Sequence, residues 1–145
     1  FMKVRTLLPA DLYIVINKTI LTEIDKKNLI NLYEPIIGAH AVSLYLTLWS
    51  DLDKLEIMSI DYSHHHLMTM LKSDLDSIKL ARKSLEAVGL LKSYLKVGES
   101  INEYIYEFIG WDQEIKEASK DTVYKAVFKE IEKEYNWNDK KYYEG

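Results

Sequence analysis

The alternation of apolar and polar residues divides the chain into stretches with helical spacing and stretches with strand spacing. Residues 11–19 are rich in β-branched and aromatic side chains, which predicts a short strand or extended arm. Residues 21–38 follow helical spacing until Pro35 interrupts them, and residues 38–52 are apolar almost all round, as is typical of a central buried helix. The apolar positions of the first of these helices are Ile24, Leu29, Leu32 and Tyr33.

Residues 53–62 alternate apolar with polar side chains over a short segment, which is compatible with an edge strand. A short helix followed by a longer one is predicted after this segment. Ser63 stands where an N-cap is expected, and Gly89 stands where the longer helix should end. The apolar faces are Leu67, Met68 and Leu71 in the first helix, and Leu75, Ile78, Ala81, Leu85 and Val88 in the second. This arrangement is the helix-turn-helix pattern.

The spacing changes from helix to strand after Gly89. Residues 90–97 and 101–110 alternate apolar with polar side chains, and Gly98 supplies a turn between them, which predicts a β-hairpin. A hairpin directly after a helix-turn-helix is a wing. The expected fold is therefore mostly α: a winged helix-turn-helix with a small β-hairpin wing and an additional C-terminal helix.

Residues 111–145 are more highly charged and again helical in spacing. Val123, Val127, Ile131 and Tyr135 recur every four residues, which predicts an amphipathic helix. We therefore expect a winged-helix domain with an N-terminal extended arm at residues 1–110, and a C-terminal amphipathic helix and tail at residues 111–145.

Composition limits the classes of protein that the chain can belong to. Its 145 residues, 48% of them hydrophobic, can bury one core of ordinary size. Cysteine is absent, which excludes disulfides and thiolate chemistry and fits a reducing compartment. No apolar run approaches the roughly 20 residues that span a bilayer, and the N-terminus lacks the pattern of a secretory signal. We expect a cytoplasmic domain.

Three consecutive histidines, His64 to His66, are the most conspicuous candidate for a metal site. Two imidazoles bind one metal from a helix when they stand four residues apart, whereas consecutive residues point in different directions. The fourth histidine, His40, falls on another predicted helix. We therefore expect polar residues in the first turn of a helix, with no metal and no cofactor. No phosphate-binding glycine loop or nucleophile motif is present, so we expect no enzyme.

A helix-turn-helix raises the question of DNA binding, but the charges argue against sequence-specific recognition. The net charge of −4 gives no general attraction for nucleic acid. Recognition helices place their N-terminal residues on base edges, and here these are Asp74, Asp76 and Ser77. Basic residues follow later on the helix and on the wing, where they are suited to weak, salt-sensitive phosphate contacts: Lys79, Arg82, Lys83, Lys92 and Lys96.

Four segments in this order resemble a known family. They are LYEPIIG (residues 32–38), SLYLTLW (43–49), ARKSLEAVGLL (81–91) and YIYEF (104–108). Together they resemble the N-terminal domain of the DnaB replication initiation and membrane attachment proteins of low-GC Gram-positive bacteria, a family related to the primosome protein DnaD. The resemblance covers Leu7 to Phe108.

The resemblance implies a winged helix that drives self-association in a protein acting at the replication origin. It implies no catalytic site, partners such as the loader ATPase and the replicative helicase, and a link to membrane attachment of the origin. In that family, single-strand binding is associated mainly with a C-terminal domain, whose aromatic-rich motif is not found here. DNA contact is therefore expected mainly through parts of the full-length protein outside this chain.

Apolar residues that a small winged helix would not need for its own core are candidates for the oligomer interface. Burying such side chains between subunits contributes about 1.5–3 kcal/mol each. The alternative is that they complete the core of the monomer. A different class of function, a DNA-binding transcriptional regulator, is disfavoured by the acidic start of the second helix. The interface candidates are Leu7, Leu8, Leu12, Tyr13, Ile14, Tyr124, Phe128 and Ile131.

Overall fold

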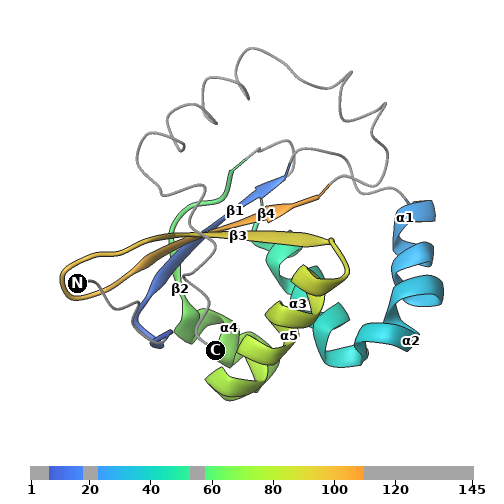
Figure 1. Cartoon of the computed structure of the whole chain (residues 1–145), viewed down its shortest axis with the longest axis horizontal. Helices are drawn as coiled ribbons and strands as arrows, with labels where there is room; N and C mark the ends of the chain where they lie inside the picture. The colour runs from blue at the N-terminus through green and yellow to red at the C-terminus, as the bar shows by residue number, and fades with distance from the viewer. Residues whose placement is uncertain (1–6, 18–22, 53–57, 110–145) are drawn as a thin grey trace, which may run out of the picture.

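A four-stranded sheet packs against a group of helices in the computed structural model, which describes residues 7–17, 23–52 and 58–109 (Figure 1). The strands are β1 (Leu12–Asn17), β2 (Tyr62–Ser63), β3 (Leu91–Lys96) and β4 (Glu103–Phe108). The helices are α1 (Glu23–Asn28), the π-helix η1 (Leu29–Tyr33), α2 (Glu34–Ile37), α3 (Ala39–Ser50), α4 (His64–Leu71) and α5 (Leu75–Ala87).

The predicted helix-turn-helix and wing are confirmed. Helix α4 ends at Leu71 and is followed by Lys72, whose backbone is left-handed; Asp74 then caps α5. Gly89 follows α5 with φ at +80°, a conformation that glycine adopts without steric cost. The wing is the antiparallel pair β3 and β4, in which Leu91 faces Phe108 and Lys96 faces Glu103. Each of these elements depends on residues close together in the sequence, which explains why the pattern predicts them.

Residues 11–19, predicted as a strand or an arm, form the strand β1 as far as they are described. The sheet order is β2-β1-β4-β3, so β1 occupies an interior position, parallel to β4 and antiparallel to β2. Its N-terminal end is held by Asp11, which accepts hydrogen bonds from the amides of Asn102 and Leu8, both at 2.9 Å. The predicted edge strand at residues 53–62 is confirmed at β2 and at a bridge between Met58 and Ile16.

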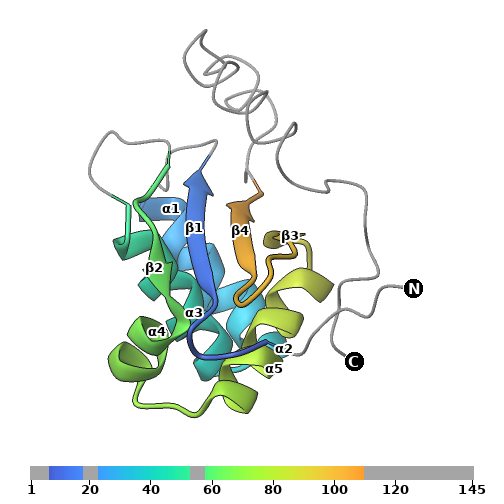
Figure 2. The same ribbon diagram turned by 90° about the vertical axis from the view of Figure 1, so that its left-hand side faces the viewer.

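The core lies between one face of the sheet and helices α3, α4 and α5 (Figures 1 and 2). Helix α3 is the central helix, as its pattern predicts, and buries five of its side chains. The Tyr45 ring meets Phe108 of β4 with centroids 4.6 Å apart. The sheet contributes side chains from alternate positions of three strands to this core: Tyr13, Val15, Leu91, Leu95, Tyr104, Tyr106 and Phe108.

The first helical stretch differs from its predicted pattern. Only Leu29 of the four expected apolar positions is buried, and Ile24 and Leu32 are exposed. Leu32 lies in η1, in which the amide of Glu34 bonds to the carbonyl of Leu29, five residues back. A π-turn contains one more residue than an α-turn, so the α-helical spacing no longer keeps Leu32 on the face of Leu29.

The predicted C-terminal amphipathic helix, with Val123, Val127 and Ile131, lies outside the described residues and stays a prediction, as does the domain boundary at residue 110.

Candidate assembly and nucleic-acid surfaces

The five basic residues predicted to contact phosphate come from helix α5 and strand β3. Lys92 is exposed, and its Nζ lies 5.6 Å from the centroid of the Tyr94 ring. Lys79, Lys83 and Lys96 are half-buried. Across the wing, Lys92 is paired in register with Glu107 and Lys96 with Glu103. Acidic residues thus accompany the basic ones on the wing, so the field it presents to a phosphate is weak.

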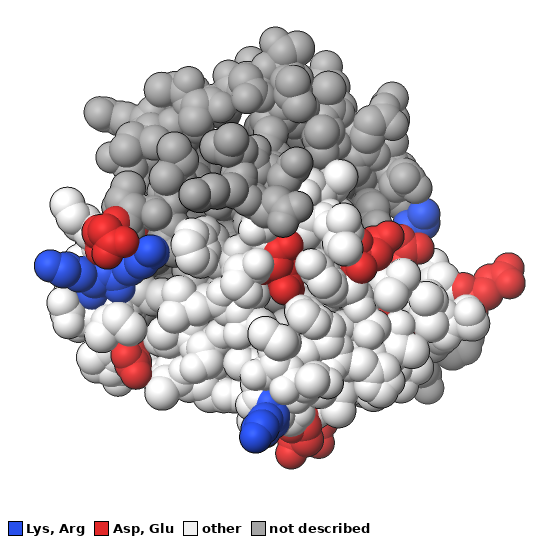
Figure 3. Space-filling view, turned by 180° about the vertical axis from the view of Figure 1, so that it is seen from behind, with Lys and Arg blue, Asp and Glu red and all other residues white. Residues whose placement is uncertain are grey.

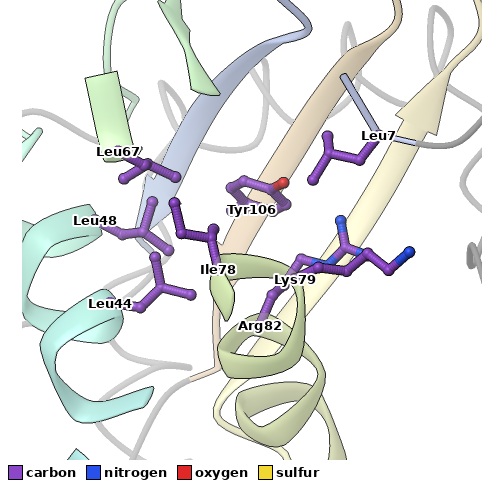
Figure 4. A pocket seen from close by; sticks show the side chains of 8 residues that line it. All are labelled: Leu7, Leu44, Leu48, Leu67, Ile78, Lys79, Arg82 and Tyr106. Carbon is purple, nitrogen blue, oxygen red and sulfur yellow. The ribbon is translucent and has the colours of Figure 1, made fainter. Parts of the chain in front are cut away.

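Arg82 contradicts its prediction. Its side chain is 2% exposed, its Nε lies 3.5 Å from Oε2 of Glu86, and its guanidinium carbon lies 5.7 Å from the centroid of the Tyr104 ring. Figure 4 shows Arg82 beside Lys79, near Leu7, in the layer between α5 and the sheet. A side chain enclosed in this way cannot reach a phosphate. The prediction is wrong because the helical spacing that places Arg82 beside Ile78 and Leu85 turns it toward the core.

The N-terminus of α5 is acidic and already occupied by its own cap. The Asp74 side chain accepts the amide of Ser77 at 2.8 Å, and this bond lowers the pKa of the Asp74 carboxyl. Asp76 adds a second carboxylate in the first turn. The helix end that a DNA-reading domain inserts into the major groove therefore carries negative charge, which a phosphate-lined groove repels.

The interface candidates of the N-terminal segment fall into two groups. Leu7, Tyr13 and Ile14 are buried within the single chain, whereas Leu8 is 42% exposed and Leu12 is half-buried. Leu7 and Tyr13 belong to the core between the sheet and the helices, whereas Ile14, the next residue along β1, faces the opposite side of the sheet. The premise that Leu7 and Tyr13 are surplus to the core of the monomer is therefore wrong, and the interface role of Ile14 stays a prediction. The other candidates, Tyr124, Phe128 and Ile131, lie outside the described residues.

Tyr13 also belongs to a buried polar cluster that its sequence did not reveal. Its hydroxyl donates to Oδ2 of Asp51 at 2.5 Å, and Nε2 of His66 lies 2.9 Å from Oδ1 of the same carboxylate. Burial, followed by the hydrogen bond to Asp51, raises the pKa of Tyr13 far above its ordinary value. Tyr13 is therefore a protonated donor that joins β1 to the end of α3.

The histidine run separates into three environments. His64 is fully buried, with Nδ1 at 2.7 Å from the carbonyl of Asp11 and Nε2 at 2.6 Å from the hydroxyl of Tyr106. Because a carbonyl only accepts, Nδ1 carries a proton and donates to Asp11, and Nε2 is hydrogen-bonded to the hydroxyl of Tyr106. His65 is exposed and His66 is half-buried. The prediction of polar first-turn residues holds for His65 and His66, whereas His64 is a core residue.

A small hollow lies between the helices and the sheet. The hollow in Figure 4 is lined by eight side chains, mostly apolar, that leave no room for a water-sized molecule. Within residues 7–17, 23–52 and 58–109, no cluster of three metal-ligating side chains occurs. The same residues contain no helix that is both long and apolar enough to cross a bilayer.

The described geometry is that of a winged helix with an acidic recognition-helix terminus, and the comparison with sequence families agrees. Residues 7–131 match the DnaB N-terminal winged helix domain. The chain belongs to this family. The match extends beyond Phe108, where the resemblance noted from individual motifs ended, so part of the segment after the wing belongs to the DnaB winged-helix domain as the family defines it.

Two relatives place this DnaB-family domain in longer proteins. The chain is 33% identical over 78 residues to the replicative helicase loading/DNA remodeling protein DnaB of Staphylococcus aureus (strain NCTC 8325 / PS 47), covering 54% of this chain and 17% of that protein. The crystal structure of primosome protein DnaB (residues 1–300) from Geobacillus stearothermophilus superposes with a TM-score of 0.66 and 30% identity, covering 88% of this chain and 52% of that one. The chain thus spans between about a sixth and half of the relatives it matches.

Proposed function

We propose that this domain is a non-catalytic oligomerisation and scaffold module of a DNA replication initiation protein that helps load the replicative helicase at the origin. The observation that carries the proposal is the family match over residues 7–131, joined to a relative named for helicase loading.

The electrostatics of α5 support assembly over sequence-specific DNA reading. The cap of the recognition helix is an ionised Asp74. Of the three basic residues in the middle of that helix, Arg82 is enclosed against Glu86. What remains for phosphate is a small set of lysines, with Lys92 the exposed one on the wing. Such contacts are weak, independent of sequence and easily screened by salt.

The partners that follow from the proposal are a second copy of this chain and other primosome proteins, such as the helicase loader ATPase and the replicative helicase. Contact with DNA is proposed to occur mainly through parts of the full-length protein outside this chain. We propose that the full-length protein is cytoplasmic and that it associates with the membrane at the replication origin.

Two measurements on the 145-residue chain test the proposal. Sedimentation velocity over a series of protein concentrations should show reversible self-association. Fluorescence anisotropy with labelled single- and double-stranded DNA should show binding that is absent at physiological salt or that disappears as salt is added. A chain that stays monomeric at every concentration and binds one duplex sequence tightly would instead be the transcriptional regulator, the second candidate that the winged helix shape alone allows.

A further inference from the structure

The sheet has a second face, turned away from the helices, which we call the far face. Helices α3, α4 and α5 cover the core face of the sheet (Figure 1), and the run α1–η1–α2 packs on α3 and α5. Alternate positions along the strands point to the far face. Four apolar side chains at these positions are nonetheless at most 9% exposed: Ile14, Ile16, Tyr94 and Ile105.

The sequence and the register of the strands agree that the far face is covered. Ile14, Ile105 and Tyr94 stand in one row across β1, β4 and β3. Glu107, in the next row, is buried as well and accepts a hydrogen bond from the Tyr94 hydroxyl at 3.0 Å. A sheet with one face in water alternates apolar with polar residues, whereas residues 13–16 of β1 are apolar without a break and all buried. Strand β1 therefore has the sequence of a strand that is covered on both faces.

Other apolar parts of the surface are open in the same chain. Figure 3 views the domain from the side of β2 and α4, where charged side chains lie mainly toward the margins. Ile60 and Met70 on that side are 70% and 56% exposed, and Ile36 of α2 is exposed too. Burial, and not a lack of charge, is therefore what distinguishes the far face. Because these exposures are those of a single copy, the cover of the far face comes from the same chain.

The segment after the wing is long enough to supply this cover. The chain leaves the sheet at Ile109, directly after the interior strand β4, and the amide of Ile109 donates to the carbonyl of Leu90 at 3.2 Å. Residues 110–145 follow, and the family match continues through them to residue 131. The other stretches outside the described residues have at most six residues each: 1–6, 18–22 and 53–57. Segments of that length are too short for a helix that runs along three strands.

We propose that residues 111–135 fold back over the far face as an amphipathic helix, with Val123, Val127 and Ile131 toward the sheet. From Val123 to Tyr135 such a helix extends about 20 Å, and a six-residue strand extends about 20 Å as well. The apolar stripe meets the apolar rows of the sheet, and the opposite, mostly charged side of the helix meets water. The stripe then serves a single copy of the chain, so this inference is independent of the self-association proposed above.

The absence of cysteine allows a direct test, because one introduced thiol reports on one position. Ile105→Cys places a thiol on the far face and Val15→Cys places one on the core face; both residues are 0% exposed. In the 145-residue chain both thiols should react slowly with Ellman's reagent. Adding Val127→Asp puts a carboxylate into the stripe and should speed the reaction at position 105 at least about tenfold, while position 15 stays protected. Lys129→Asp, on the opposite side of the predicted helix, is the matched control and should change neither rate.

An unchanged rate at position 105 in the Val127→Asp chain would overturn the inference, because another segment would then cover the far face. Faster reaction at both positions would mean that the variant unfolds, so a second measurement uses the unaltered chain. Lysine cross-linking with mass spectrometry should join Lys92 or Lys96, which border the far face, to lysines within residues 116–133. In a mixture of chains with two isotopic compositions, cross-links confined to one composition support the inference. Cross-links between the two compositions, or none to residues 116–133, would overturn it.

Discussion

Tyr13 offers a quantitative test of whether β1 belongs to the core of the monomer. The side chain is 0% exposed, and its hydroxyl donates to the Asp51 carboxylate at 2.5 Å. A hydrogen bond to a charged group contributes about 1.5–3 kcal/mol. When the tyrosine hydroxyl is removed, Asp51 keeps its contact with His66 at 2.9 Å and so is not left without a partner. Tyr13→Phe should therefore lower the unfolding free energy by about 2 kcal/mol. Tyr13→Ala also removes the ring from the core, and such truncations cost about 3–5 kcal/mol.

The assay is urea unfolding followed by far-UV circular dichroism, at a protein concentration low enough to keep the chain monomeric. Both variants should lower the midpoint without changing the slope of the unfolding free energy against urea. Leu8→Ala is the control from the same segment, because Leu8 is largely exposed; it should change stability by less than about 0.5 kcal/mol. A Tyr13→Ala chain as stable as wild type, but impaired in self-association, would refute the assignment to the core and restore the interface prediction.

The same residue gives a pH dependence with a definite sign. The pKa of Tyr13 is raised in the folded chain by burial first and then by Asp51, so the folded state holds this proton more tightly than the unfolded state. Its contribution to stability is present below the ordinary tyrosine pKa of about 10 and decreases above it, as the unfolded chain ionises. Stability should fall less steeply above pH ~10 in Tyr13→Phe than in wild type. Parallel curves for the two proteins would contradict the raised pKa.

Four further changes test the buried histidine, the basic residues and the helix cap. His64→Phe removes the hydrogen bonds of the ring to the Tyr106 hydroxyl and the Asp11 carbonyl inside the core. It should lower the unfolding free energy by about 1–3 kcal/mol in urea, and an unchanged midpoint would show that these bonds are absent in solution. Arg82→Met removes the cation beside Glu86 and should lower the unfolding free energy by about 3 kcal/mol, while leaving any salt dependence of DNA binding unchanged. Lys92→Gln should instead reduce the slope of that salt dependence, measured by anisotropy, by about one. The reverse pattern would place Arg82 at the phosphate. Asp74→Ala should lower the urea midpoint at pH 7, and the difference from wild type should vanish in acid. The reason is that a carboxyl whose pKa is lowered in the folded state stabilises that state only while it is ionised. A difference that persists in acid would exclude the cap as its source.

Arg82 and His64 show the limit of one-dimensional patterns. Both are polar side chains that the sequence alone assigns to the surface, and both are enclosed by contacts with strand β4, to Tyr104 and Tyr106 respectively. A weak signal was available for Arg82, since it lies among the apolar positions of its helix next to Ala81. For His64 no local signal exists, because its partners, Asp11 and Tyr106, are distant in the sequence.

The sequence by itself determined the helix-turn-helix, the wing and the central helix α3, because capping residues, turn glycines and apolar spacing act between residues a few positions apart. It also determined the family, through motifs that follow one another in order. Only the tertiary structure decided that β1 lies parallel to β4 in the interior of the sheet, a pairing that joins Asp11 to Asn102. It also decided which charged and aromatic side chains that pairing encloses. Strand pairing and side-chain burial of this kind depend on how much surface segments distant in the sequence bury together, and a local sequence pattern does not contain that information.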